Sequence, residues 1–286
     1  MGHALPPGLG ILLALAYDLG AFGKLAQSTE TVYNIAHITR SNENLHYLIV
    51  SDIHANLVAF QAVLADAPAF DQIWCLGDLV GYGPNPNECI ERIQEFPHLS
   101  LAGNHDWAAL GKLDIKNFNA DARAATIWTQ SELTPAAREY LRGLPTHVAL
   151  DSFTMAHASP REPVWEYVLD ANVAYANFSN FSTPMCLVGH THIPLIFEMN
   201  EQRGRCETMG PPFNGRMKLE NRRMIINPGS VGQPRDGDPW ASYAILDTEN
   251  MTWDFRRVPY AIEITQERMR ARGLPRRLVD RLEIGR

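Results

Sequence analysis

The chain has 286 residues, of which 45% are hydrophobic and 20% are charged, and its formal net charge is −7. This length allows a substantial hydrophobic core, in one large domain or two small ones. A protein that binds nucleic acid without sequence preference is more often basic, so the charge argues against stable nucleic-acid binding. The four cysteines form no CxxC pair and predict no disulfide framework, which makes a reducing cytoplasm the expected setting.

Residues 1–44 read as an N-terminal extension of unclear role, ahead of one domain at 45–286. The apolar run at 9–16 is far shorter than the roughly 20 residues needed to cross a bilayer. No Lys or Arg precedes Lys24, whereas a secretory signal carries positive charge before its apolar run. We therefore expect neither a signal peptide nor association with a membrane.

The first part of the domain alternates between strand-like and helix-like segments. Three apolar segments predict buried strands, at 45–50, 72–76 and 98–101. Two segments with helical spacing lie between them, at 56–66 and 87–96. This alternation is typical of a layered α/β domain. Residues 117–143 also look helical, with a start signal at Thr134-Pro135 and a stop signal where Gly143 precedes Pro145.

The second part of the domain is dominated by short strand-like segments, which predict a second sheet. We expect strands at 148–150, 153–156, 185–188, 195–198, 224–226, 243–246 and 253–256. Residues 203–221 read as a hairpin or loop. A helix at 262–272 and a last short helix after Gly273-Leu274-Pro275 close the chain.

Five polar motifs follow the predicted strands. They are Asp52-Ile53-His54, Gly77-Asp78, Gly103-Asn104-His105-Asp106, His157 and Gly189-His190-Thr191-His192. Because strand ends of an open α/β sheet meet at one edge, we expect these motifs to converge there. Asp52 and His54 are two residues apart, and on extended backbone their side chains would point the same way.

The chemistry of these motifs indicates two bound metal ions. Imidazole mixed with carboxylate and amide oxygens suits Mn²⁺, Fe or Zn²⁺ better than Ca²⁺ or Mg²⁺, which prefer oxygen ligands alone. The absence of thiolates argues against a structural zinc site. An aspartate such as Asp78 can use both oxygens and bridge two ions. Two divalent transition-metal ions held close together point to attack of water on a phosphate ester.

This motif set resembles that of the calcineurin-like metallophosphoesterase superfamily, across roughly residues 45–286. Two further segments and the C-terminal Gly-Leu-Pro helix are similar to its YfcE-like branch of small prokaryotic phosphodiesterases. The segments are Gly81-Tyr82-Gly83-Pro84 and Asn227–Arg235. The resemblance implies an α/β fold in which two facing mixed β-sheets are flanked by helices, a four-layer αββα sandwich.

The resemblance also implies a role for each residue of the motifs. Asp52, His54 and His192 would hold the first metal ion, and Asn104, His157 and His190 the second. Asp78 would bridge them, and a hydroxide shared by the ions would be the nucleophile. His105 would stabilise the transition state or protonate the leaving group, Asp106 would orient the His105 ring, and Arg235 would contact a phosphate oxygen.

The expected activity is hydrolysis of a small phosphate ester or nucleotide, with a phosphodiester preferred over a phosphomonoester. Alternatives that use the same site are a phosphoprotein phosphatase and a dinucleoside polyphosphate hydrolase. A catalytically silent scaffold is less expected, because His105 stands beside a complete ligand set. The helical insert at 107–145 is expected to cap the site, and the arginines between 256 and 286 to lie on a solvated helix. The natural substrate, the native metal and the oligomeric state are not determined by the sequence.

Overall fold

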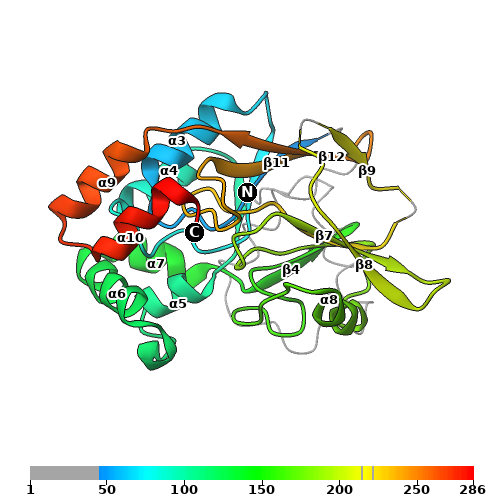
Figure 1. The fold of residues 1–286 in the computed structure, drawn as a ribbon, viewed down its shortest axis with the longest axis horizontal. Helices are drawn as coiled ribbons and strands as arrows, with labels where there is room; N and C mark the ends of the chain where they lie inside the picture. The colour runs from blue at the N-terminus through cyan, green and yellow to red at the C-terminus, as the bar shows by residue number, and fades with distance from the viewer. Residues whose placement is uncertain (1–44, 214, 221) are drawn as a thin grey trace, which may run out of the picture. The chain divides into compact units, whose positions relative to one another are not determined.

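The computed structural model describes residues 45–213, 215–220 and 222–286. The predicted N-terminal extension and its apolar run lie outside these residues. Within the described part of the chain, the structure contains two mixed six-stranded sheets with helices against them (Figure 1).

The first sheet has the strand order β3-β2-β1-β11-β12-β9. Strands β1, β2 and β3 pair in parallel, and β11, β12 and β9 add antiparallel pairs at the other side of β1. The strands are β1 (His46–Val50), β2 (Gln72–Cys75), β3 (His98–Ser100), β9 (Arg216–Lys218), β11 (Ala241–Asp247) and β12 (Thr252–Val258).

The second sheet has the strand order β4-β5-β6-β10-β7-β8. Here β5, β6 and β10 are mutually parallel neighbours, flanked by antiparallel partners. The strands are β4 (His147–Leu150), β5 (Phe153–Ala156), β6 (Met185–Leu187), β7 (Leu195–Asn200), β8 (Arg205–Met209) and β10 (Met224–Asn227).

Alternating side chains of the strands build separate apolar layers, so the fold is the predicted αββα sandwich. In β1, Leu48 and Val50 pack with Phe60 of α3 (Leu57–Asp66) and Ile90 of α4 (Pro86–Gln94). Ile49, between them, faces the second sheet. The residues between the two sheets include Ile49, Trp74, Met155, Leu187, Ile226, Leu246 and Trp253. On the outer face of the second sheet, Cys186 and Phe197 pack with Ala174 of α8 (Ala171–Asn177).

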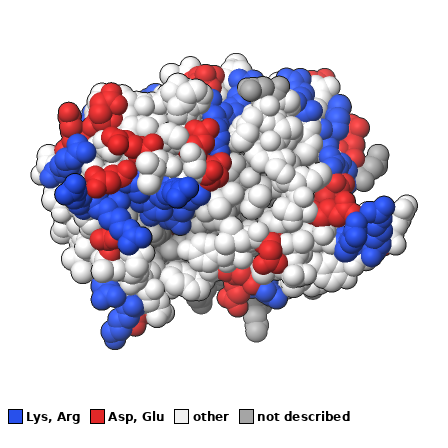
Figure 2. Space-filling view, viewed as in Figure 1, with Lys and Arg blue, Asp and Glu red and all other residues white. Residues whose placement is uncertain are grey.

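A further group of helices lies at the end of the domain opposite β8 and β9 (Figure 1). They are α5 (Asn104–Ala109), α6 (Ala120–Glu132), α7 (Pro135–Gly143), α9 (Ile262–Ala271) and α10 (Arg276–Asp280), with single 3₁₀ turns at Ile115–Asn117 and Arg281–Ile284. A third 3₁₀ turn, Phe178–Asn180, follows α8. Phe118 and Ala122 pack with Met269 and Leu278, so the predicted insert rests on the C-terminal helices. Figure 2 shows that Lys and Arg side chains gather over α10 on this face.

The helix signals in the sequence act as predicted. The Thr134 hydroxyl accepts a hydrogen bond from the Ala137 amide, Pro135 is the first helical residue, and α7 ends at Gly143. The segment predicted as a hairpin or loop at 203–221 divides between the sheets, because β8 pairs with β7 and β9 pairs with β12. The short helices α5 and α8 were not predicted.

Two expectations about the whole chain can be compared with the described residues. The four cysteines are free thiols, three of them buried. Among the helices that the structure describes, none combines the length and the apolar character needed to cross a membrane.

Candidate metal centre

The predicted motifs converge at the carboxyl ends of the parallel strands. Asp52 and His54 follow β1, Asp78 follows β2, and the α5 motif follows β3; in the second sheet the histidine motifs follow β5 and β6. This edge is where an open α/β sheet collects ligand-binding residues. All ten side chains assigned from the sequence lie in this region, and nine of them are buried, Arg235 being half-buried.

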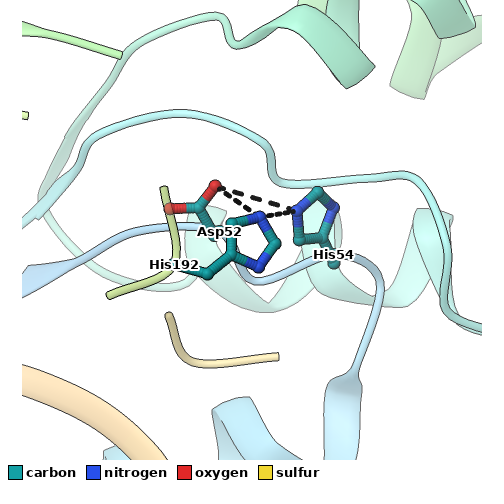
Figure 3. Close-up of side chains that lie close together, drawn as sticks. All are labelled: Asp52, His54 and His192. Carbon is teal, nitrogen blue, oxygen red and sulfur yellow. Dashed lines mark hydrogen bonds and ion pairs between the residues drawn. The ribbon is translucent and has the colours of Figure 1, made fainter. Parts of the chain in front are cut away.

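One group of potential ligands consists of Asp52, His54 and His192, whose side chains point toward one another (Figure 3). The Nε2 atoms of the two histidines are 3.0 Å apart. The Asp52 Oδ1 atom lies 3.3 Å from His192 Nε2 and 3.7 Å from His54 Nε2. Three donor atoms from two sheets therefore surround one point.

A second group consists of Asp78, His157 and His190. His157 Nε2 lies 3.3 Å from Asp78 Oδ2 and 3.1 Å from the Asn104 side-chain oxygen, which places Asn104 in this group. The same Asp78 oxygen is 3.6 Å from His54 Nε2 of the first group. Asp78 thus lies between the two groups, where a bridging ligand would be.

The histidine rings are oriented by main-chain carbonyl groups. The Nδ1 atom of His54 lies 3.2 Å from the Val80 oxygen, that of His157 lies 2.9 Å from the Leu76 oxygen, and that of His192 lies 2.6 Å from the Gln233 oxygen. A carbonyl oxygen can only accept, so each Nδ1 carries the hydrogen and donates. In a neutral ring, Nε2 then carries a lone pair that can bind a metal ion.

The protonation and hydrogen bonding of these residues are suited to binding a pair of cations. Burial lowers the pKa of His54 and of His192 well below the usual value, so both rings are neutral and their lone pairs face each other across 3.0 Å. Asp52 Oδ1 and His190 Nε2 are buried, and neither has a hydrogen-bond partner among the described residues. Each such orphan costs about 1–3 kcal/mol. A cation at each group would remove both the repulsion and the missing contacts.

In Asp52 and Asp78, the carboxylate oxygen that points away from the histidines accepts hydrogen bonds from the protein. These bonds fix the direction of the other oxygen. Asp52 Oδ2 accepts hydrogen bonds from the Ser51 hydroxyl at 2.6 Å and from the His190 amide at 3.1 Å. Asp78 Oδ1 accepts one from the His105 amide at 2.8 Å. Neither Ser51 nor the His190 amide was predicted, because nothing in a single sequence distinguishes such supporting donors.

Ionisation in the metal-free site is governed by burial and by Asp78. Burial raises the pKa of Asp52 to about 6, with a contribution from the nearby Asp78 charge. Burial also raises that of Asp78, but His157 and His105 outweigh it and the net pKa is lowered. Burial opposes protonation of His157, yet Asp78 outweighs it and raises the pKa to about 9. Without metal, His157 and Asp78 therefore form a buried ion pair.

The backbone at the ligands is not the extended strand that the sequence predicted. β1 ends at Val50, and Asp52 and His54 have φ angles of 53° and 48°. Asp78, His190 and His192 are also left-handed, with φ between 53° and 64°. Such a backbone costs about 1–3 kcal/mol per residue and persists where the surroundings impose it.

Hydrogen bonds between the loops impose this conformation. The amides of Asp52 and His54 donate to the carbonyls of Gly77 and Asp78, at 3.0 and 2.9 Å. On the other side, the Gly232 amide donates to the Asp52 carbonyl at 3.0 Å. Asp52 and His54 thus share one site because three loops bond to one another, not because they alternate along a strand.

Two glycines permit the close approach of these loops. A Cβ atom on Gly103 would lie 2.0 Å from Asp78 Oδ1. Gly77 has a φ of 103°, and its Cβ would lie 2.7 Å from His157 Nδ1. Both positions therefore require glycine for the ligands to reach their places.

The prediction that Asp106 orients the His105 ring is wrong. Asp106 accepts hydrogen bonds from three main-chain amides instead, those of Asp78 at 2.8 Å, Val80 at 3.1 Å and Gly103 at 2.9 Å. A carboxylate at the third position of α5 is well placed to bind the amides of its own helix start, and here it also fixes the Asp78 loop. Asp106 thus ties the loop that carries Asp78 to the start of α5.

His105 lies over the site against aromatic rings. Its ring centroid is 5.0 Å from that of His54, 4.2 Å from that of Tyr82 and 4.9 Å from that of Phe118. Burial lowers the pKa of His105 to about 4 although Asp78 opposes this, so the ring is neutral at neutral pH. Its Nδ1 atom is buried with no partner in the described part of the chain.

The outer rim of the site contains Arg235 and two tyrosines. Arg235 donates to the Gln233 side-chain oxygen at 2.9 Å and lies 3.5 Å from the Tyr82 hydroxyl. The Tyr167 ring centroid is 4.0 Å from that of His190. Tyr82 belongs to a motif noted in the sequence, whereas Tyr167 stands in no recognisable pattern and was missed.

Comparison with known proteins identifies the family. The sequence model of the calcineurin-like phosphoesterase superfamily domain matches residues 45–251. The chain belongs to this superfamily. It is 46% identical to a metallophosphoesterase from Sphaerobacter thermophilus of known crystal structure, with a TM-score of 0.79 over 85% of this chain and 100% of that one. The family resemblance stated from the motifs is thereby confirmed.

Two curated proteins are also similar. An uncharacterised protein of Methanocaldococcus jannaschii is 38% identical over 83% of this chain and 97% of its own length. The symmetrical bis(5'-nucleosyl)-tetraphosphatase of Glaesserella parasuis is 29% identical over 41% of this chain and 46% of its own. Structural neighbours include the phosphoesterase YfcE of E. coli, at 19% identity and a TM-score of 0.39.

Proposed function

We propose that this chain is a metal-dependent phosphoesterase with two divalent transition-metal ions. Asp52, His54 and His192 would hold one ion, and Asn104, His157 and His190 the other, with Asp78 bridging them. The set of imidazole, carboxylate and amide donors favours Mn²⁺, Fe or Zn²⁺. When bound, two such ions would lower the pKa of a water molecule and neutralise the oxygens of a phosphate ester.

One observation carries the proposal. The facing lone pairs of His54 and His192, with the unpartnered Asp52 oxygen beside them, form an arrangement that a cation would stabilise and that neutral packing would not. Asp78 lies between the two groups, with its Oδ2 atom 3.6 Å from His54 Nε2 and 3.3 Å from His157 Nε2.

The residues around the metal ligands have separate roles in the proposed reaction. The His105 ring lies 5.0 Å from that of His54, and in its neutral form it is suited to donating a hydrogen bond to a phosphate or leaving-group oxygen. Arg235 supplies a planar pair of N–H donors at the rim, which match two phosphate oxygens. The carbonyls of Val80, Leu76 and Gln233 keep the histidine rings from turning.

The substrate class that we favour is a small phosphodiester, as the sequence motifs predict. The tetraphosphatase relative supports a second candidate, hydrolysis of a dinucleoside polyphosphate, over the part of the chain that it matches. We retain the expectation of a cytoplasmic enzyme from the cysteine content, and we do not expect stable nucleic-acid binding.

Purified protein that is loaded with Mn²⁺ tests the proposal. We expect about two metal ions per chain by elemental analysis, and hydrolysis of bis(4-nitrophenyl) phosphate that a chelator abolishes. Parallel assays with Zn²⁺, Ni²⁺ and Co²⁺, and with phosphopeptide and diadenosine tetraphosphate, separate the alternatives. A protein that binds two ions but hydrolyses none of these substrates would favour the scaffold.

A further inference from the structure

A large basic pocket lies beside the candidate metal centre. It has a volume of about 1010 Å³. Its lining includes Tyr82, Tyr167 and Arg235 on the metal side and Arg276, Arg277 and Arg281 on the side of the C-terminal helices. In all, five arginines and two aspartates line it, in a chain whose net charge is −7. The basic character of the pocket is therefore local.

The arginines in and beside this pocket differ in whether they pair with an acidic side chain. Arg272 on α9 pairs with Glu132 at 3.0 Å, and Arg276 pairs with Asp280 at 3.2 Å. Within the described residues, Arg235, Arg277 and Arg281 form no ion pair with a carboxylate side chain. Arg281 donates from Nε to the main-chain oxygen of Arg286 instead.

The positive charges are close enough to affect one another. Burial and the nearby charges of Arg235 and Arg277 together lower the pKa of Arg281 to about 10, although Tyr82 and Asp121 act in the opposite direction. Like charges drawn together without acidic partners are unfavourable, and an anion between them would reverse this. Arg276 and Arg277 are exposed, as a solvated helix predicts, whereas Arg281 is half-buried.

The pocket and the metal centre share a wall. Arg235 lies 3.5 Å from the Tyr82 hydroxyl, and the Tyr82 ring is 4.2 Å from the ring of His105. On the other side, Tyr167 packs on His190 with centroids 4.0 Å apart. A substrate whose reacting phosphate lies at the metal ligands can thus extend past Arg235 into the pocket.

The C-terminal side of the pocket lies beyond the residues that the superfamily model matches. The family match ends at residue 251, whereas Arg277 and Arg281 belong to α10 and the turn that follows it. Leu278 and Leu282 anchor this segment against Phe118 and Met269. The pocket is therefore built where this segment packs on the insert that precedes α6.

We propose that the arginine pocket binds a second phosphate group of the substrate, so that the enzyme acts on small molecules with at least one phosphate beyond the one that reacts. This inference rests on the proposed function. Guanidinium groups bind phosphate through two parallel hydrogen bonds, which distinguishes this anion from a single carboxylate contact. Three arginines without acidic partners suit a phosphate chain, as in a nucleoside polyphosphate.

Two substrates and two matched variants test the proposal. We compare the Mn²⁺-loaded wild type with R277S and with the double variant R277S/R281S, and use R272S, whose arginine lies on the α9 surface, as the control. In the double variant KM for diadenosine tetraphosphate should rise at least about tenfold, since each charge-assisted hydrogen bond is worth that much affinity. Kinetic constants for bis(4-nitrophenyl) phosphate, which has one phosphorus, should stay within about twofold.

A binding measurement separates this proposal from the proposed function. Calorimetric titration of the chelator-treated full chain with tripolyphosphate should give a Kd that rises at least about tenfold in R277S/R281S and not in R272S. R277S alone, at an exposed position, should show a smaller effect in the same direction. If the wild type hydrolyses neither substrate, the proposed function fails and this titration decides the inference. Equal affinity of wild type and double variant for tripolyphosphate overturns it.

Discussion

The Nε2 atoms of His54 and His192 lie 3.0 Å apart, while the opposite nitrogen of each ring donates to a main-chain carbonyl. The two residues come from different sheets and are 138 positions apart in the chain. Neither ring can rotate to relieve the contact without leaving a buried N–H group unpaired. The fold thus holds the Nε2 lone pairs of the two histidines facing each other, as in a metal site to which no ion is bound.

Replacing His192 with alanine should remove one of the two metal ions. The first group would then keep only Asp52, His54 and the shared Asp78. We expect elemental analysis to give about one ion per chain and turnover to fall by at least about 10²-fold. H147A removes a histidine on an exposed strand and is the matched control. Two full equivalents of metal in H192A would contradict the assigned ligand set.

His105 should affect turnover without affecting metal content. H105N keeps a polar side chain but loses the ring that lies over His54. If the ring donates a hydrogen bond in the transition state, kcat should fall by about 10²–10³. Metal content, measured on the same samples, should equal that of the wild type. Wild-type kcat in H105N would remove the proposed role.

Asp106 should contribute to stability and only indirectly to catalysis. In D106N the single amide oxygen cannot accept from all three amides that the carboxylate satisfies. At least one buried N–H group then lacks a partner, which costs about 1–3 kcal/mol in the free energy of unfolding. Denaturant unfolding measures this loss, with D151N as an exposed control. A weaker metal affinity should accompany it, because the Asp78 loop loses its support.

Metal affinity should depend on pH through His157. In the metal-free protein the pKa of His157 is raised to about 9, so the ring is protonated at pH 7 and must lose its proton when a metal binds. The apparent affinity should therefore increase with pH up to about 9 and then level off. The pKa of Asp52 is raised to about 6, so below that pH metal binding should release a second proton, from Asp52.

Calorimetry in two buffers of different ionisation enthalpy measures this proton release directly. We expect about one proton released per chain at pH 7 as metal binds. An affinity that stays constant between pH 6 and pH 9, with no dependence of the heat on the buffer, would show that His157 does not exchange a proton for a metal ion.

The sequence by itself determined the strands and helices that frame the site. Apolar runs such as 45–50 became β1, and local signals such as Thr134-Pro135 began α7, because both kinds of pattern act within a few residues. The types of candidate ligand also follow from the sequence. Several imidazole and carboxylate groups that gather at strand ends indicate a metal site more than any other kind of site. The two-sheet sandwich followed from the alternation of these segments and from the family resemblance.

Only the tertiary structure decided how the parts of the site support one another. The left-handed backbone of Asp52 depends on Gly77 and Gly232, and its carbonyl also accepts from the Ser230 hydroxyl, 178 positions away. Asp106 binds main-chain amides and not the His105 ring, because two of those amides, of Asp78 and Val80, come from the loop that follows β2. The pocket that Arg277 and Arg281 line exists because α10 packs beside the insert. Such contacts arise from the close packing of segments that are distant in sequence, and no short-range pattern in the chain encodes them.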